Sequence, residues 1–402
     1  MKHIIFIISI SILFSTCSTV KTLKVINNGK VADKTYNYEI PFEIVLGEIL
    51  VQVKINGKDY RFFFDTGALN IISKEVADAL KLESKARIEI NDVNNNTDSL
   101  DITTIPKLSI NNHLFLNQGF GVYDFKKSKE ISCINIDGII GANLVRKSVV
   151  QVNMKEKKLY ISSSKESLHV PTELKGVPFQ INAASSPKIN LQINETWIKD
   201  ITLDYGSNSG IDLGLSSFNI DSLTLGRKHV RSVGSSNVGL MGDGYDTTYM
   251  FVAEKTGIGS MMVENELISV RKTGTSTMGT KFLQNYTVTI DWNDKLVYFD
   301  KLPETGASSA SKLESFGISG RLKDDKFVVT ELIEKSSADI YGLQLGDQLL
   351  IVGEKNFTSP TLDDYCNVIK NGLFPEDKKQ VRVTYKRDEY VNNVNLIKQA
   401  LL

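Results

Sequence analysis

Two aspartates in matching local sequences are the residues best suited to do chemistry. Asp65 lies in the segment Phe62-Phe63-Phe64-Asp65-Thr66-Gly67-Ala68, and Asp204 lies in the segment Ile201-Thr202-Leu203-Asp204-Tyr205-Gly206-Ser207. Two carboxyl groups that share one proton can activate water as a base and protonate a leaving group as an acid. Like charges about 3 Å apart do not both ionise easily, so the two pKa values of such a pair separate. The pair suggests hydrolysis without a metal or a covalent nucleophile.

The residues around the two aspartates have to hold the carboxyl groups in place. Gly67 and Gly206 let the backbone turn tightly, so that main-chain amides can reach the carboxylates. The Ser207 hydroxyl is expected to add a hydrogen bond to Asp204. The other candidate supporting residues are Thr66, Ala68 and Tyr205 in the aspartate motifs and Ile140, Gly141, Met278 and Gly279 in two later segments.

The chain contains two similar units. The segment Ile-Ile-Gly-Ala-Asn-Leu-Val at 139–145 follows Asp65 at nearly the same distance as Thr-Met-Gly-Thr-Lys-Phe-Leu at 277–283 follows Asp204. Each is followed by two strand-like stretches, and a Pro-Phe segment precedes each aspartate. Such matched landmarks in one order indicate an internal repeat. We therefore expect two homologous lobes, over residues 36–162 and 176–302.

The elements that position these motifs are predicted to be strands. Short alternating apolar stretches, such as 50–55, 87–90 and 189–193, are separated by Asn, Gly, Asp and Ser, which is typical of strands and turns. Residues 74–82 are a helical exception. The expected fold class is mostly β, with two small folded sheets packed together. The small, polar segment 303–312 is predicted to be a linker.

These motifs resemble those of aspartic proteases of the pepsin and retropepsin kind. The resemblance rests on apolar-apolar-Asp-Thr-Gly-Ala followed by apolar-apolar-Gly in the same unit. It implies one bilobal body in which Asp65 and Asp204 are catalytic and the substrate is a polypeptide. It also implies that the apolar-apolar-Gly segments pack beneath the aspartate loops. Two polar stretches, 91–98 and 233–245, are the expected lids, although each can equally be an ordinary surface loop.

Tyr205 departs from the family pattern, which has Thr or Ser at this place. The family's hydroxyls lock the two aspartate loops across the lobe interface. Either the interface is remodelled around the tyrosine ring, or the second site has drifted. The sequence therefore leaves two functions open, an active endopeptidase and an inactive protein or scaffold that binds peptides. Carbohydrate binding is a third reading, but the 8% of aromatic residues form no clustered platform.

The last segment, 313–402, resembles a PDZ domain. The resemblance rests on Ser336-Ser337-Ala338-Asp339-Ile340-Tyr341-Gly342-Leu343-Gln344-Leu345-Gly346-Asp347-Gln348-Leu349. It implies that a loop takes the carboxylate of a peptide C-terminus and that the next strand pairs with the peptide. That loop consists of Ser315, Phe316, Gly317 and Ile318, and a helix near 361–369 forms the other wall. The alternative is a module that only packs against the lobes.

The N-terminal segment 1–17 has the pattern of a signal peptide. Lys2 and His3 precede an apolar run that is too short to span a membrane. The segment ending at Cys17 resembles a bacterial lipobox, which implies a lipidated Cys17, the alternative being plain cleavage nearby. The expected location is exported, periplasmic or outer-membrane-associated, with membrane contact only through this anchor.

Composition excludes several other functions. Lys and Arg number 47, as do Asp and Glu, so no net field exists to bind nucleic acid. The three later histidines are scattered without ligand spacing, and neither a metal nor another cofactor is expected. Cys133 and Cys366 fall in different predicted domains, so we expect buried, unpaired thiols rather than a disulfide. A monomer is expected because one chain supplies both aspartates.

Overall fold

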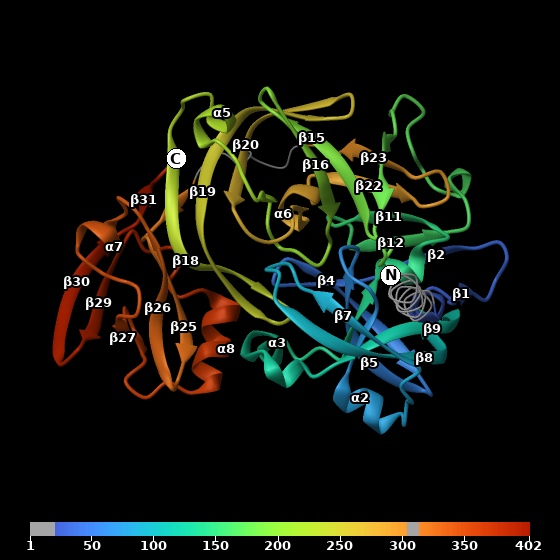
Figure 1. The fold of residues 1–402 in the computed structure, drawn as a ribbon, viewed down its shortest axis with the longest axis horizontal. Coiled ribbons are helices and arrows are strands. Elements are labelled where there is room, and N and C mark those ends of the chain that lie inside the picture. Colours follow the sequence, from blue (N-terminus) through green and yellow to red (C-terminus); the bar gives the residue numbers. More distant parts are fainter. Residues whose placement is uncertain (1–20, 304–312) are drawn as a thin grey trace, which may run out of the picture.

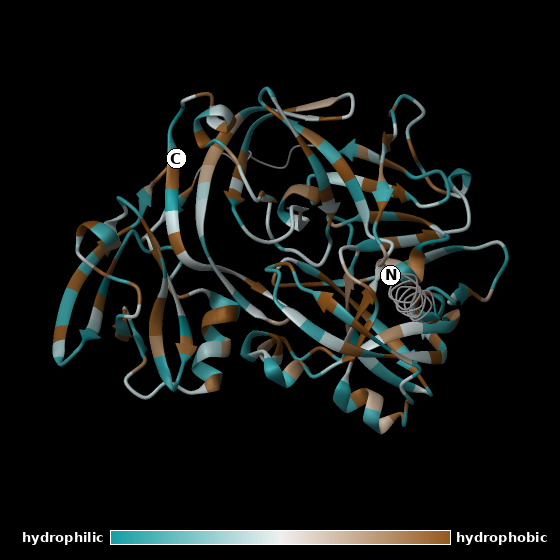
Figure 2. Cartoon of the chain, in the orientation of Figure 1, coloured by the Kyte–Doolittle hydropathy of each residue, from teal (hydrophilic) through white to brown (hydrophobic). Residues whose placement is uncertain are grey.

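The computed structural model describes residues 21–303 and 313–402, and strands dominate both ranges (Figure 1). The mostly β class expected from the sequence is confirmed. Apolar and polar residues alternate along many strands (Figure 2), so that one face of each sheet can be buried. The predicted signal peptide and Cys17, and the predicted linker beyond its first residue, lie outside the described residues.

The first lobe is built on a nine-stranded sheet. Its strands are β1 (Lys30–Val31), β3 (Glu43–Val45), β4 (Glu48–Ile55), β5 (Lys58–Asp65), β6 (Ile71–Ser73), β7 (Ala86–Asn91), β8 (Thr97–Ile110), β9 (His113–Tyr123) and β10 (Gly138–Gly141). Asn56 and Gly57 join β4 to β5, and both have positive φ. An Asn-Gly pair suits the tight turn that matches the twist of a hairpin.

The second lobe and the C-terminal segment share a fourteen-stranded sheet. The strands from the second lobe are β14 (Gln180–Ile181), β15 (Pro187–Ile193), β16 (Thr196–Leu203), β17 (Ile211–Gly214), β18 (His229–Gly239), β19 (Gly242–Ile258), β20 (Met261–Arg271) and β21 (Thr277–Met278). In this lobe β16 pairs in parallel with β21, and in the first lobe β5 pairs in parallel with β10. Each pairing brings an aspartate motif beside its later glycine-containing segment.

A six-stranded sheet joins the two lobes. Its strands are β2 (Asn37–Pro41), β11 (Val149–Asn153), β12 (Lys158–Ser162), β13 (Val177–Pro178), β22 (Tyr286–Asp291) and β23 (Leu296–Lys301). The hairpins β11–β12 and β22–β23 match the strand-like stretches seen in the sequence, and β11 pairs with β22 across the lobes. Buried side chains from both lobes form one hydrophobic cluster. The two lobes therefore share a common core, beside which a smaller cluster is built mainly from residues of the first lobe.

The C-terminal module, residues 313–402, has a separate hydrophobic cluster, to which the first lobe contributes Cys133. Its elements are β24 (Glu314–Ser315), β25 (Ile318–Lys323), β26 (Lys326–Ile333), α7 (Ser337–Ile340), β27 (Gln348–Val352), β28 (Lys355–Asn356), α8 (Leu362–Asn371), β29 (Gln380–Arg387), β30 (Tyr390–Ile397) and β31 (Gln399–Ala400). Phe327 stacks on Phe357 in this cluster, with ring centroids 4.3 Å apart. Strand β26 pairs with β18, so the module extends the sheet of the second lobe (Figure 1).

The helices are short and lie mainly between strands. Outside the module they include α2 (Lys74–Ala79), η1 (Phe125–Lys127), α3 (Lys129–Ile134), α4 (Ala142–Val145), η2 (Lys165–Ser167), α5 (Ile220–Thr224) and α6 (Thr280–Leu283). Ser73 caps α2 by accepting a hydrogen bond from the Val76 amide. No helix within the described ranges has the length and apolar character needed to cross a membrane.

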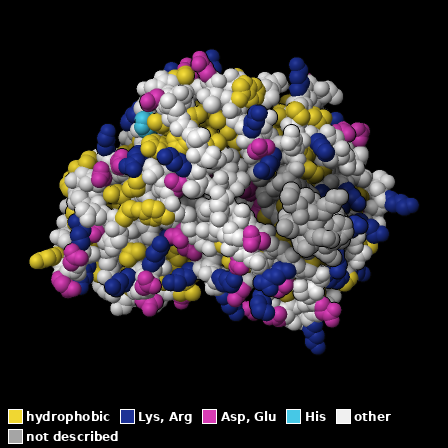
Figure 3. All heavy atoms as spheres, viewed as in Figure 1, with side chains coloured by type: hydrophobic (Ala, Val, Ile, Leu, Met, Phe, Trp, Pro, Cys, Tyr) yellow, Lys and Arg dark blue, Asp and Glu magenta, His cyan; other side chains and the backbone are white. Residues whose placement is uncertain are grey.

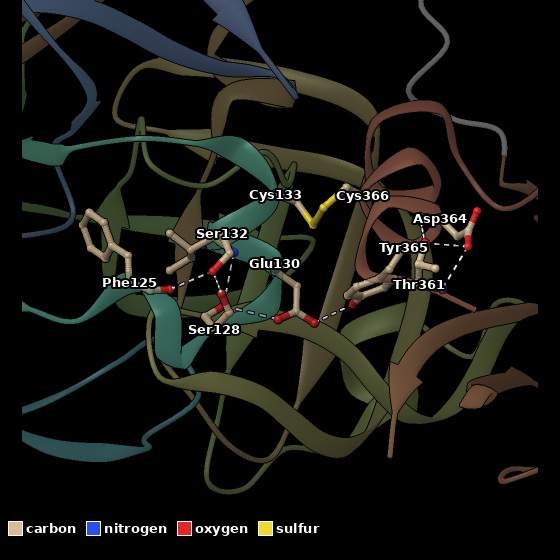
Figure 4. The surroundings of a disulfide bond; sticks show 10 residues. Phe125, Ser128, Glu130, Ser132, Cys133, Thr361, Asp364, Tyr365 and Cys366 are labelled. Atoms are coloured by element: carbon tan, nitrogen blue, oxygen red, sulfur yellow. Dashed lines mark hydrogen bonds between the residues drawn. A yellow bond between two sulfur atoms is a disulfide. The ribbon is translucent and has the colours of Figure 1, made fainter. Parts of the chain in front are cut away.

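A disulfide connects the first lobe to the C-terminal module. Cys133 of α3 is bonded to Cys366 of α8, with their Cα atoms 5.0 Å apart (Figure 4). The prediction of two unpaired thiols was therefore wrong. The two cysteines meet because α3 docks on α8, where the Tyr365 hydroxyl donates a 2.5 Å hydrogen bond to Glu130. This contact joins parts of the chain that are far apart in sequence, and no local pattern indicates it.

Candidate active site

Asp65 and Asp204 face each other at the interface between the lobes. Asp65 is the last residue of β5, and Asp204 directly follows β16. Their carboxyl groups are hydrogen-bonded to one another. The Gly67 amide donates to Asp65 Oδ1 at 2.7 Å, and the Gly206 amide donates to Asp204 Oδ1 at 2.9 Å. The structure thus brings the two predicted aspartates within reach of one shared proton.

Each glycine also lies against the carboxyl group of the other lobe. A methyl group at position 67 would lie 2.7 Å from Cγ of Asp204, and one at position 206 would overlap the carboxyl group of Asp65. No side chain larger than hydrogen fits at either place without moving an aspartate. The two Asp-x-Gly motifs therefore require glycine because the opposing carboxyl group occupies the space.

Burial and mutual charge shift the titration of the pair. Desolvation raises the pKa of Asp65, while hydrogen bonds from Asp204 and from the Gly67 and Ala68 amides oppose this rise. Desolvation raises the pKa of Asp204 well above its usual range, and the charge and hydrogen bond of Asp65 add to the effect. Asp65 therefore ionises first, and Asp204 holds the shared proton.

Thr66 links the two lobes directly. Its buried hydroxyl donates a 2.6 Å hydrogen bond to the Leu203 carbonyl and accepts a 3.2 Å bond from the Tyr205 amide. Tyr205 is fully buried, and its hydroxyl has no hydrogen-bond partner among the described residues. Its ring packs near Phe64, with centroids 6.2 Å apart. The dyad geometry thus coexists with a tyrosine ring inside the core.

The apolar-apolar-Gly segments lie next to the aspartate loops. Gly141 pairs with Asp65 in the parallel ladder, and Ile140 pairs with Phe64. In the second lobe the Asp204 amide donates to the Met278 carbonyl at 3.0 Å, and the Gly279 amide donates to the Gly210 carbonyl at 2.9 Å. Backbone hydrogen bonds therefore fix the position of both loops.

Two buried asparagines complete this support in the first lobe, and the sequence reasoning missed them. Asn70 accepts a hydrogen bond from the Gly141 amide at 2.8 Å, and Asn143 accepts one from the Asn70 amide at 2.7 Å. Asn143 stands in the Ile-Ile-Gly-Ala-Asn segment, where a polar residue in an apolar run was the available signal.

Ser207 differs from the expectation, because its hydroxyl pairs with Ser209 Oγ at 2.8 Å rather than with Asp204.

The two predicted lid segments contact each other. The turn between β7 and β8 meets the turn between β18 and β19, where Asp92 accepts a 3.1 Å bond from the Met241 amide and Asn94 donates a 3.2 Å bond to the Gly242 carbonyl. The Val93 carbonyl accepts from the Thr275 amide at 2.9 Å. The segment 233–245 is a β-hairpin rather than the polar loop that the sequence suggested.

The sequence reasoning also missed Glu48, a third carboxyl group near the pair. Burial, followed by the charge of Asp65, raises the pKa of Glu48 to about 8. Glu48 in turn contributes to the raised pKa of Asp204. No cluster of three or more metal-ligating side chains occurs among the described residues.

The predicted carboxylate loop of the module connects β24 to β25. Gly317 has a φ of 103°, which favours glycine, and its amide donates to Ser315 Oγ at 3.0 Å. Phe316 is buried and stacks on Phe374, with centroids 4.4 Å apart, and Ile318 begins β25. At the other end of β25, Lys129 of the first lobe donates a 3.3 Å bond to the Leu322 carbonyl. Helix α3 therefore lies against both β25 and α8.

A comparison with protein families adds an independent observation. The family described as aspartyl protease matches residues 51–144, a range that includes Asp65, the first predicted lid and β10. This match supports a retropepsin-like aspartyl protease and hence a protease-like function. No curated protein matches the chain.

Proposed function

We propose that the protein is an exported aspartic endopeptidase whose catalytic residues are Asp65 and Asp204. The observation that carries the proposal is the hydrogen bond between their carboxyl groups, with one glycine amide fixing each carboxylate. One carboxylate and one carboxylic acid are the two groups that peptide hydrolysis needs. The matching parallel pairings of β5 with β10 and of β16 with β21 support an origin by duplication.

The proposed mechanism assigns different roles to the two aspartates. Asp65, which ionises first, takes a proton from a water molecule while the oxygen of that water attacks the carbonyl carbon of the peptide bond. Asp204 gives its proton to the carbonyl oxygen, which forms a neutral tetrahedral intermediate. When the C–N bond breaks, the proton held by Asp65 passes to the departing nitrogen. Asp204 recovers its proton from the intermediate, and the products are a carboxylic acid and an amine.

The second candidate function is peptide binding without cleavage, and Tyr205 is the residue that favours it. In the first motif the Thr66 hydroxyl bonds across the lobe interface. At the corresponding place in the second motif, Tyr205 has a buried ring whose hydroxyl has no partner in the described part of the chain. We favour the active enzyme because both carboxyl groups are retained at high desolvation cost, which a purely structural site would not require.

The C-terminal module is proposed to be a PDZ domain that binds peptide C-termini or substrates. The glycine turn at Gly317 and the adjoining β25 and α8 support this role. The contacts of α3 with β25 and α8 favour the alternative, in which the module packs against the lobes. Both roles are compatible if a peptide uses the end of β25 near Gly317.

Export through a lipid anchor at Cys17 remains part of the proposal. The disulfide supports it, because disulfides persist mainly in oxidising compartments such as the periplasm. A monomer is proposed because both aspartates come from one chain. Figure 3 shows basic and acidic side chains interspersed over the visible face, so this face does not present the single-sign basic patch that binds nucleic acid.

Cleavage of an unbiased peptide library tests the proposed function. We expect the full-length mature protein to cleave a subset of the library, and a transition-state-mimicking inhibitor of aspartic proteases to block cleavage. Binding of the peptides without any cleavage would instead support the second candidate function.

A further inference from the structure

Glu48 stands directly beside Asp65 in the first lobe. The antiparallel register of β4 and β5 pairs Leu50 with Phe63. Continued by two residues, this register places Glu48, the first residue of β4, opposite Asp65, the last residue of β5. Side chains of directly opposite residues point to the same face, with Cβ atoms about 4.5–5.5 Å apart. The two carboxyl groups therefore share one face of the sheet.

The turn that carries Glu48 is fixed against the second lobe. Leu46 and Gly47 have positive φ and join β3 to β4. Asn208, which follows the Asp204 motif, donates a 3.2 Å hydrogen bond to the Leu46 carbonyl. Glu48 thus directly follows a tight turn that is hydrogen-bonded to the second lobe.

The Glu48 carboxylate has no ion-pair or hydrogen-bond partner among the residues that the structure describes, although its side chain is partly exposed. Two other buried carboxylates have such partners. Asp212 forms an ion pair with the buried Arg271, and Asp347 forms one with the half-buried Arg387. Desolvation without a partner favours the neutral form of Glu48, in line with its raised pKa. A cation supplied by a ligand would favour the ionised form.

We propose that Glu48 selects a lysine or arginine side chain of the polypeptide substrate next to the scissile bond. The inference rests on the proposed endopeptidase function. An ammonium or guanidinium group favours ionisation of Glu48 and can form charge-assisted hydrogen bonds with the resulting carboxylate. It also offsets the negative charge that an ionised Glu48 places beside Asp65. A neutral side chain of the same length gains neither interaction.

The selection applies to one side of the scissile bond. In the second lobe the register pairs Lys188 with Thr202, and its continuation places Ser186 opposite Asp204. Ser186 is fully buried and carries a neutral hydroxyl. Of the two register partners that the described strands place opposite the aspartates, only the one in the first lobe is acidic. The preference for a basic residue should therefore appear at one substrate position and not at its mirror position.

The test compares peptides that differ only in having lysine, arginine, glutamine or norleucine at each position around the cleaved bond. We expect wild type to prefer the basic residues at one position by about 10- to 100-fold in kcat/KM. Glu48→Gln should reduce that ratio at least about tenfold, mainly through KM for the basic peptide. Glu156→Gln makes the same chemical change at an exposed position elsewhere and should keep the wild-type ratio.

The outcomes separate this inference from the proposed function. If wild type cleaves peptides but the ratio is near one, or Glu48→Gln leaves it unchanged, the inference is overturned and the endopeptidase stands. A shifted pH profile with an unchanged ratio would make Glu48 a positioning residue and also overturn it. No cleavage by wild type overturns both. If Glu48→Gln does not fold, the preference can be measured on wild type alone. Two peptidomimetic inhibitors that differ only in lysine or norleucine at this position give the ratio of basic to neutral binding from their inhibition constants, and a ratio near one overturns the inference.

Discussion

Thr66 and Tyr205 occupy corresponding places in the two aspartate motifs, but only the Thr66 side chain reaches across the lobe interface. The Thr66 hydroxyl bonds to the Leu203 carbonyl and to the Tyr205 amide, whereas the Tyr205 ring is enclosed by apolar side chains. The interface is therefore locked from one side by hydrogen bonds and from the other by packing. This asymmetry makes two different sets of mutations informative.

Two replacements of Tyr205 should distinguish the contribution of the ring to stability from that of its hydroxyl. Tyr205→Phe removes a buried hydroxyl that has no partner among the described residues, so we expect unchanged or higher stability in urea unfolding. Tyr205→Thr introduces the residue type that Thr66 has in the first motif but leaves a cavity, and we expect a loss of about 2–5 kcal/mol. A loss above about 1 kcal/mol for Tyr205→Phe would show that the hydroxyl has a partner.

Replacement of Thr66 should weaken the hydrogen-bonded side of the interface. Thr66→Val keeps the shape but leaves the Leu203 carbonyl without its donor, so we expect a loss of about 1–3 kcal/mol together with reduced kcat. Thr66→Ser is the matched control, since it retains the hydroxyl and should stay closer to wild type. Equal effects of the two substitutions would argue against a role for the hydroxyl.

The stability of wild type should fall as pH rises above about 4, through the pKa values of the folded dyad. Both aspartates have pKa values above 3.8, the value of a free aspartate, so the folded state binds more protons than the unfolded state in this range. The stabilisation is complete below the pKa that the aspartates have in the unfolded state. It is lost as pH rises and the two aspartates ionise in the folded state. Asp204→Asn removes the more strongly shifted group. Its melting temperature relative to wild type should therefore increase between pH 4 and pH 7, and a constant difference over this range would contradict the shifts.

The Cys133–Cys366 disulfide should hold the C-terminal module against the first lobe. The double variant Cys133→Ser/Cys366→Ser should lose about 2–5 kcal/mol of stability. Hydrogen exchange should increase first in α3 and α8, because the pairing of β18 with β26 still holds the module to the second lobe. A reductant should reproduce the loss in wild type and have no further effect on the variant. Wild type that is insensitive to reductant would contradict a stabilising role.

Local motifs made the aspartates and the mostly β class predictable, because glycine turns and apolar alternation leave a signature within a few residues. The disulfide and Glu48 could not be predicted, since each depends on a tertiary contact. Cys133 meets Cys366 only after α3 docks on the module, and Glu48 lies opposite Asp65 only through strand register. The glycine- and serine-rich segment 233–245 lacks apolar alternation, yet pairing of β18 with both β19 and β26 keeps it in a sheet.

The most direct test of the account is peptide cleavage by Asp65→Asn and Asp204→Asn beside wild type. Each substitution removes the proton sharing between the carboxyl groups, so we predict that wild type cleaves and that either variant loses at least about 10²- to 10⁴-fold in kcat. Thermal melting and circular dichroism should show that both variants remain folded. Either variant retaining wild-type turnover, or wild type cleaving no peptide while binding the same peptides as Asp204→Asn, would contradict the catalytic dyad.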